Sequence, residues 1–209
     1  MQLRLAPGTD VHAETEVRRS RFVTVLRRVA DEDGARALVT EARRARPDAR
    51  HHCSAFVVEV PGSNRVERSS DDGEPAGTAG MPMLEVLRGA GVTDAAVVVS
   101  RYFGGIKLGT GGLVRAYSDA VRAALAGAAL VRPEPLGLWA VELPHGEAGR
   151  VQAELHNAGV VVHDVVYGSA VTLTLATDDG DALAARLAEI TSGEAEPHAV
   201  GSTVVEHPC

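Results

Sequence analysis

A chain of 209 residues, of which 45% are hydrophobic but only 3% aromatic, is long enough for two small domains with cores built from Val, Leu and Ala. Its net charge of −7 is uneven: residues 1–136 hold 19 Lys and Arg against 17 Asp and Glu, whereas residues 137–209 hold 2 against 11, so a polyanionic partner is expected to meet the N-terminal half first. No apolar run approaches the roughly 20 residues of a membrane span, and the first residues lack the apolar stretch of a signal peptide, which excludes a membrane protein and predicts a cytosolic one.

Strand and helix patterns alternate along the N-terminal half. Apolar residues recur at helical spacing over 33–46, with acids in the first turn and arginines in the last, as the helix dipole favours. Residues 92–102 have the composition of a buried central strand. The expected elements are strands at 11–18, 21–29, 53–60, 66–69 and 92–102 and helices at 33–46, 83–89 and 112–126.

The segment Pro133-Glu134-Pro135 interrupts both periodicities and is the expected domain boundary. Beyond it the pattern predicts a βαββαβ order, which is that of a ferredoxin-like domain with both helices on one face of an antiparallel sheet. The expected elements there are strands at 139–143, 160–167, 170–176 and 199–206 and helices at 147–157 and 179–191. The predicted domains are residues 1–134 and 137–207.

A glycine-rich loop joins the central strand to the helix at 112–126. Five glycines permit positive φ and close approach of a ligand, and the free N–H groups of the following helix attract anions; they are Gly104, Gly105, Gly109, Gly111 and Gly112. Arg101, Arg115 and Lys107, the only lysine of the chain, bracket the loop with positive charge. Thr110 stands where a Walker A motif needs lysine, and Val114 breaks the dinucleotide pattern. A generic anion site remains, beside the alternative that the glycines only let the helix pack close to the sheet.

A second polar loop, residues 71–80, places three carboxylates within four positions: Asp71, Asp72 and Glu74. The spacing is wrong for an EF-hand. One hypothesis is a Mg²⁺ site completed by a substrate phosphate. The other is that the acids pair with Arg101 or Arg115, or accept backbone N–H bonds in a structured turn, either of which would bring the two loops together.

Adjacent histidine and cysteine side chains, His51-His52-Cys53, suggest a metal site or a nucleophile. Because neighbouring strand residues point to opposite faces, only His51 and Cys53 share a side. No spaced partner set exists for zinc, and the two cysteines of the chain, Cys53 and Cys209, form no disulfide framework. The sequence therefore predicts reduced thiols, no resident metal and a histidine that hydrogen-bonds at a sheet end.

Three motifs together resemble the IMPACT/YigZ family: Asp-Ala-Arg-His-His-Cys at 48–53, Ser-Asp-Asp-Gly-Glu-Pro-Ala-Gly-Thr-Ala-Gly at 70–80, and Arg-Tyr-Phe-Gly-Gly-Ile-Lys-Leu-Gly-Thr-Gly-Gly-Leu-Val-Arg-Ala-Tyr at 101–117. The resemblance spans the whole chain. It implies an α+β protein with a two-layer N-terminal domain similar to ribosomal-protein folds and to domain IV of elongation factor G, followed by the ferredoxin-like domain. It also implies a role in translational control, and it transfers no catalytic residue.

The combined interpretation is a cytosolic binding protein that acts on translation and contacts RNA, the ribosome or a translation-associated protein through its N-terminal domain. No cofactor is expected. Arg101, Lys107 and Arg115 would contact phosphates, while Asp72, Glu74 and Thr78 would orient the arginines or the ligand. The remaining expected ligand-binding residues are His52, Asp71, Tyr102, Gly104, Gly105, Gly109, Thr110, Gly111 and Gly112. Two alternatives stay open: a Mg²⁺-dependent enzyme of small phosphates or nucleotides, and a pure protein-binding adaptor.

Overall fold

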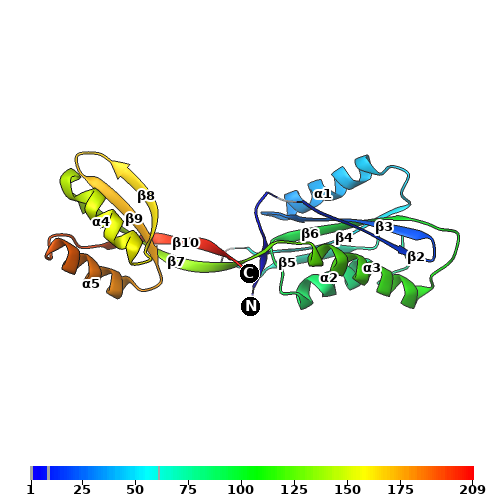
Figure 1. The fold of residues 1–209 in the computed structure, drawn as a ribbon. Helices are drawn as coiled ribbons and strands as arrows, with labels where there is room; N and C mark the ends of the chain where they lie inside the picture. The colour runs from blue at the N-terminus through cyan, green and yellow to red at the C-terminus, as the bar shows by residue number, and fades with distance from the viewer. Residues whose placement is uncertain (1, 9, 61) are drawn as a thin grey trace. The chain divides into compact units, whose positions relative to one another are not determined.

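A computed structural model describes residues 2–8, 10–60 and 62–209. It divides into two compact units, one of Met1–Arg132 with His207–Cys209 and one of Pro133–Glu206. Figure 1 labels the elements. They are β1 (Arg4–Leu5), β2 (Asp10–Val17), β3 (Ser20–Arg28), α1 (Glu32–Ala45), β4 (His51–Val58), β5 (Val66–Ser70), α2 (Gly80–Gly89), β6 (Ala95–Tyr102), α3 (Thr110–Ala126), β7 (Leu130–Leu143), α4 (His145–Asn157), β8 (Val161–Tyr167), β9 (Val171–Thr177), α5 (Gly180–Thr191) and β10 (His198–Pro208).

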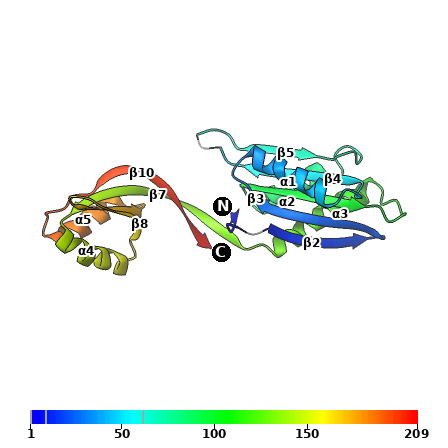
Figure 2. The ribbon, with the colours of Figure 1, turned by 90° about the horizontal axis from the view of Figure 1, so that it is seen from above.

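The first unit is built on an antiparallel sheet with the strand order β2-β3-β6-β4-β5, which can be followed in Figure 2. Strand β6 is central, and its residues 95–101 are all buried. Hydrophobic side chains on its two faces pack into two separate cores, because helices cover the sheet on both sides. Helices α2 and α3 pack on one face and α1 packs on the other.

The α+β class is confirmed, but the layers of the first unit differ from the expectation. Two layers were expected, and helix α1 adds a third. The signal lies in β6, where Ala95 to Val99 run on without polar alternation. Such a run is typical of a strand that is buried on both faces.

Two helix starts show how local chemistry sets the ends of elements. Helix α1 begins at Glu32, one residue before the expected start, because the Asp31 side chain accepts a hydrogen bond from the Gly34 N–H at 2.8 Å and caps the helix. Helix α3 begins at Thr110, two residues before the expected start, and Gly109 precedes it with a φ of 73° that glycine adopts without strain. Thr110, Gly111 and Gly112 therefore form the first helical turn. Among the described residues, no helix combines the length and apolarity that a membrane span requires.

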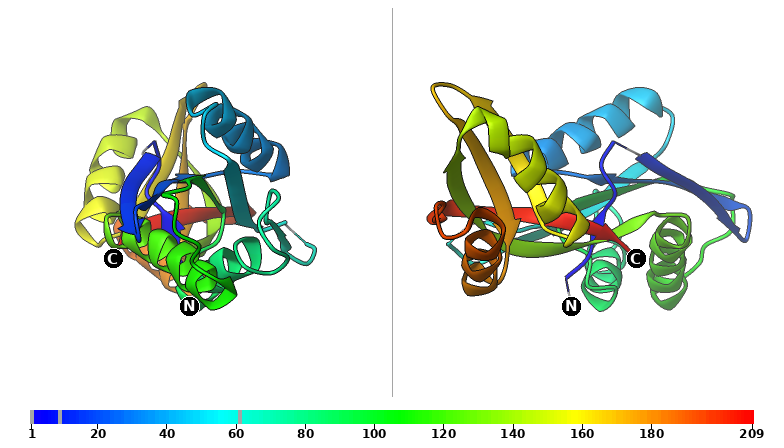
Figure 3. Two further views of the ribbon diagram at one scale, coloured as in Figure 1. Left: turned by 90° about the vertical axis from the view of Figure 1, so that its right-hand side faces the viewer. Right: turned by 60° about the vertical axis from the view of Figure 1, so that its left-hand side comes forward.

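The second unit has the expected βαββαβ order, β7-α4-β8-β9-α5-β10. Strands β7, β9 and β8 pair in that order and β10 pairs with β7, so the ferredoxin-like prediction is confirmed. Helices α4 and α5, visible in Figure 3, contribute Val151, Leu155 and Leu187 to one core with Leu173 and Leu175 of β9. Both helices thus cover the same face of this sheet.

The Pro133–Pro135 segment lies inside strand β7, although the sequence predicts a break there. Strand β7 pairs with β1 through residues 130–131 and with β9 through residues 137–143. The two prolines lie between these stretches, so their missing N–H groups take nothing from the β1 or β9 ladder, and β7 pairs in addition with β10. Residue spacing alone could not show that an extended backbone continues through them.

Candidate functional site

A row of three side chains crosses the first sheet at the end where the glycine-rich loop leaves β6. Phe22 on β3 and His51 on β4 are the register partners of Arg101 on β6, so all three project from one face. This is the face that α2 and α3 cover. Beside the row lies a cavity of about 460 Å³. Its lining residues are Arg50, His51, Glu74, Pro75, Arg101, Phe103, Lys107, Leu108, Gly109, Thr110 and Leu113.

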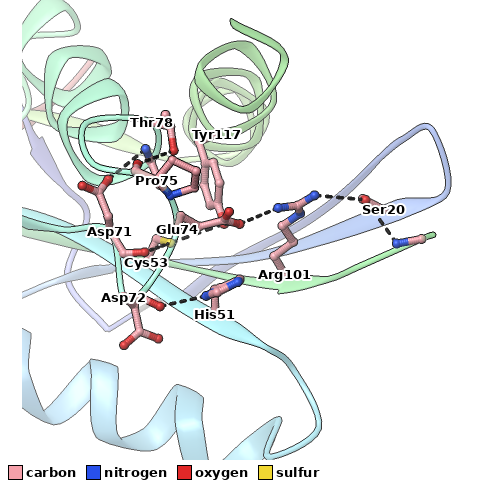
Figure 4. A network of polar contacts seen from close by, with 12 residues as sticks. Ser20, His51, Cys53, Asp71, Asp72, Glu74, Pro75, Thr78, Arg101 and Tyr117 are labelled. Carbon is pink, nitrogen blue, oxygen red and sulfur yellow. Dashed lines mark hydrogen bonds and ion pairs between the residues drawn. The ribbon is translucent and has the colours of Figure 1, made fainter. Parts of the chain in front are cut away.

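An ion pair forms the floor of this cavity. Arg101 donates to Glu74 Oε1 at 2.6 Å, and the two side chains are only 8% and 4% exposed. The Tyr117 hydroxyl donates to the same carboxylate oxygen at 2.7 Å (Figure 4). An acid of one loop thus pairs with an arginine next to the other loop, which is one of the two arrangements that the sequence left open. The pair neutralises the charge of Arg101.

Ser20 connects the floor to the hairpin between β2 and β3. Its Oγ accepts from the Arg101 guanidinium at 3.4 Å and from the Gly104 N–H at 3.2 Å (Figure 4). The guanidinium of Arg101 also lies 5.5 Å from the Phe22 ring centroid and 5.8 Å from that of Phe103. Its Nε has no hydrogen-bond partner among the described residues. One donor of this buried arginine therefore has no partner among the described residues.

The acidic loop is fixed by its own hydrogen bonds. The Asp71 carboxylate accepts from the backbone N–H groups of Gly77, Ala79 and Gly80 at 2.8–2.9 Å. Burial alone would raise the pKa of Asp71, but these three bonds together outweigh burial and lower it below the usual value. Thr78 closes the turn by donating to the Pro75 carbonyl at 2.6 Å. Backbone acceptance by an acid, the other arrangement left open, is thus also present.

Asp72 is engaged on both of its carboxylate oxygens. The Arg43 guanidinium donates to one at 2.5 Å, and the His52 backbone N–H donates to the other at 2.6 Å. His51 Nδ1 lies 2.8 Å from the Asp72 carbonyl, so the loop is also tied to the sheet edge. Neither Asp71 nor Asp72 has a carboxylate oxygen without a partner, and no three metal-binding side chains gather among the described residues.

His52 and Cys53 are buried in different directions. His52 Nδ1 lies 2.9 Å from Ser100 Oγ, and burial lowers the pKa of His52, which favours the neutral imidazole. It lies outside the cavity lining, unlike His51. The Cys53 thiol lies 3.0 Å from the Asp71 carbonyl oxygen and 3.3 Å from the Tyr117 hydroxyl. Burial raises the pKa of Cys53 to about 12.

Cys53 is expected to resist alkylation in the folded protein, because thiolate is the reactive form and almost none exists at neutral pH. Cys209 is exposed and is expected to react. Intact-mass measurement after iodoacetamide treatment at pH 8 should show one added group per chain, rising to two in denaturant. The Cys209→Ser variant should add none while folded. Rapid labelling of the folded variant would contradict the burial of Cys53.

The sequence-predicted site residues divide among several environments. Glu74, Arg101, Lys107, Gly109 and Thr110 line the cavity. Gly112 and Arg115 line a separate hollow of about 230 Å³, together with Arg18 of the β2–β3 hairpin.

The other predicted residues of the glycine-rich loop line neither hollow. The Arg21 guanidinium lies 4.8 Å from the centroid of the Tyr102 ring, and the Tyr102 hydroxyl donates to Asp48. Gly104 lies against the hairpin backbone. Gly105 and Gly111 are exposed, and a side chain at either position would meet no atom within 4 Å of its Cβ.

The residues at this end that were not among the predicted site residues include Arg18, Arg19, Arg50 and Phe103. Arg18 and Arg19 form a two-residue turn between the paired Val17 and Ser20. Arg50 lies over the Phe103 ring, 6.0 Å from its centroid. The available signal was the position of Phe103, an aromatic residue directly before the glycines.

The chain is similar to proteins of one family over nearly its whole length. Residues 18–125 match the model of the Impact N-terminal domain, and residues 141–194 match that of a domain of unknown function (DUF1949). The IMPACT family member YigZ of Escherichia coli (strain K12) is 38% identical over 192 residues, 92% of each chain. The IMPACT family member YvyE of Bacillus subtilis (strain 168) is 33% identical over 88% of this chain and 84% of its own. A crystal structure described as that of an hypothetical protein is 36% identical, with a TM-score of 0.60 over 96% of this chain and 98% of that one.

Proposed function

The chain belongs to the IMPACT family, and on that premise we propose that it acts on translation by holding single-stranded RNA on the glycine-loop end of its first unit. The proposed surface comprises the cavity lining, the Tyr102–Thr110 loop, the Arg18–Arg19 hairpin turn and the start of α3, and is called the loop surface below. Single strands bind to grooves that combine positive charge with exposed aromatic rings. The loop surface offers both.

Cations without a carboxylate partner carry the proposal. Arg18, Arg19, Arg50, Lys107 and Arg115 are exposed, and none forms an ion pair with any described residue. Several other arginines are neutralised: Arg27, Arg88 and Arg150 each contact two acids. Unpaired cations grouped on one surface are the electrostatic footprint of a polyanion site, because phosphates can replace their counterions.

Backbone strain at the hairpin supports the same surface. Arg18 and Arg19 have φ values of 48° and 67°. This left-handed backbone conformation costs residues other than Gly, Asn and Asp about 1–2 kcal/mol each. A two-residue hairpin turn of this kind normally uses Asn-Gly. Two strained arginines at the turn support a contact made by their charges, because strained backbone gathers at binding sites.

The first turn of α3 adds backbone donors. Leu113 N–H donates to the Gly109 carbonyl, whereas the N–H groups of Thr110, Gly111 and Gly112 have no hydrogen-bond partner among the described residues. Free amides at a helix N-terminus attract anions. A Cβ at Gly111 would meet no atom within 4 Å, so close packing does not require glycine there. The bare backbone leaves room for a phosphate to approach.

The Lys107→Ala/Arg115→Ala double variant is expected to weaken RNA binding and to lower its salt dependence. Each lost phosphate contact on a single strand reduces the slope of log K against log salt concentration by about 0.7, so two contacts remove about 1.4. Fluorescence anisotropy of a labelled uridine tract across a salt series measures this slope. The control is Arg36→Ala/Arg122→Ala, whose arginines are exposed and pair with acids on their own helices. An unchanged slope in the Lys107/Arg115 variant would refute the proposed surface.

A protein-binding adaptor is a second candidate. A groove of about 780 Å³ lies between α2 and α3, with the exposed side chains of Met81 and Val114 in its lining. A partner helix could pack there. This candidate predicts that RNA shows no salt-dependent binding at all, so the same anisotropy series separates it from the proposal. The magnesium hypothesis gains no such support, because Asp71 and Asp72 are already engaged.

A further inference from the structure

We propose that the cavity beside the glycine-rich loop takes one unstacked nucleobase of the bound RNA, with a preference for guanine, while the phosphate of that nucleotide stays at the rim. This inference rests on the proposed function and specifies its ligand. At about 460 Å³, the cavity falls within the range of 300–1,000 Å³ that is typical of small-molecule sites. Sequence-specific binding of single-stranded RNA commonly splays one base into such a pocket.

The floor of the cavity suits a base edge better than a phosphate. Arg101 is neutralised by Glu74, so a phosphate at the floor would meet a carboxylate directly beside the guanidinium. Glu74 Oε1 accepts from Arg101 and Tyr117, whereas Oε2 has no hydrogen-bond partner among the described residues. Buried carboxylates rarely leave an oxygen unpaired, so this acceptor calls for a partner.

The rim has the opposite character. Lys107 and Arg50 are exposed there without ion-pair partners, and the free N–H of Thr110 lies on the same border of the cavity. Phe103 forms one wall, and its side chain remains 43% exposed. Aromatic rings and guanidinium planes are the surfaces on which RNA bases stack. A nucleotide would therefore meet cations at its phosphate, a ring at its base plane and a carboxylate at its base edge.

The free carboxylate oxygen sets the base preference. On its Watson–Crick edge guanine presents two neighbouring donors, the N1–H and the 2-amino group, next to the O6 acceptor. Adenine and cytosine present one amino group there and uracil a single imino group. Because an ionised carboxylate only accepts hydrogen bonds, it favours the edge with the most adjacent donors. The Arg101 guanidinium beside it can donate to O6.

The test compares three uridine tracts of equal length that differ at one central position: guanosine, inosine or an abasic residue. All three carry the same phosphates, so their salt slopes should coincide. Loss of the base is expected to weaken binding roughly 5- to 150-fold, the range of stacking on an aromatic side chain. Inosine lacks the 2-amino group, so it is expected to bind about tenfold more weakly than guanosine because one hydrogen bond to a charged acceptor is lost.

A matched pair of variants places the effect in the cavity. Phe103 and Ile106 stand in the same loop and are 43% and 41% exposed, but only Phe103 lines the cavity. Phe103→Ala is expected to reduce the difference between the guanosine and abasic tracts by removing the stacking surface, whereas Ile106→Ala should preserve the full difference. Equal affinity of the intact protein for all three tracts, with salt dependence retained, would overturn the nucleobase pocket alone. Absence of RNA binding at every salt concentration would overturn the proposed function as well.

Discussion

Replacing Glu74 with Ala is expected to lower the free energy of unfolding of the first unit by about 3–5 kcal/mol. The change leaves the Arg101 guanidinium buried without its counter-charge, and removal of one partner from a buried ion pair typically costs that much. It also deprives the Tyr117 hydroxyl of its acceptor. Urea denaturation followed by circular dichroism measures the loss.

Two further variants show whether burial is the cause. Glu85 pairs with Arg88 on the surface of α2 and its side chain is 59% exposed, so Glu85→Ala should change stability by no more than about 1 kcal/mol. Glu74→Leu/Arg101→Met removes both charges and fills similar volume, which should recover most of the lost stability. If Glu74→Ala and Glu85→Ala cost the same, the pair at the cavity floor does not have the energetics of a buried one.

The fold was largely predictable because most strands carry their burial pattern in sequence. The second unit shows this best: the Val-rich strands and the Leu/Ala helices alternate with short turns, and each expected element exists within a few residues of its predicted bounds, except that β7 begins well before residue 139. The third layer of the first unit was missed because α1 shows only that it has an apolar face, and not which side of the sheet that face covers. Strand β1 was missed because two residues carry no periodicity.

The site was harder to predict because its contacts join distant segments. The sequence places acids and arginines in two loops, but only the fold selects Glu74 as the partner of Arg101, 27 positions away. The same contact changes how Arg101 can act, since a neutralised buried guanidinium is a poorer phosphate ligand than the exposed cations around it. Arg18 and Arg19 escaped prediction for another reason: sequence rules for a tight hairpin look for Asn and Gly, and arginines there violate the rule.

Gly104→Ala is expected to destabilise the first unit by about 1–3 kcal/mol and to weaken RNA binding together with it. A Cβ on Gly104 would lie 2.1 Å from the carbonyl carbon and oxygen of Arg19, and 2.5 Å from Ser20 N. These are backbone atoms of the hairpin turn, which cannot rotate away as a side chain could, so the loop and the turn must move apart. The Ser20 bridge between Gly104 and Arg101 would be lost with that movement.

Gly111→Ala is the matched control, because it adds the same methyl group to the same loop region. Gly111 lies in the first turn of α3, where a Cβ meets nothing within 4 Å, and alanine is favoured over glycine in helices by up to about 1 kcal/mol. Thermal unfolding should therefore shift upward for Gly111→Ala and downward for Gly104→Ala. Shifts of opposite sign would show that Gly104 is needed for close packing against the hairpin, whereas Gly111 is not needed for packing and leaves the backbone of the helix start uncovered. Downward shifts of similar size in both variants would instead mean that the whole loop requires glycine for packing and that Gly111 does not leave an open anion-binding backbone.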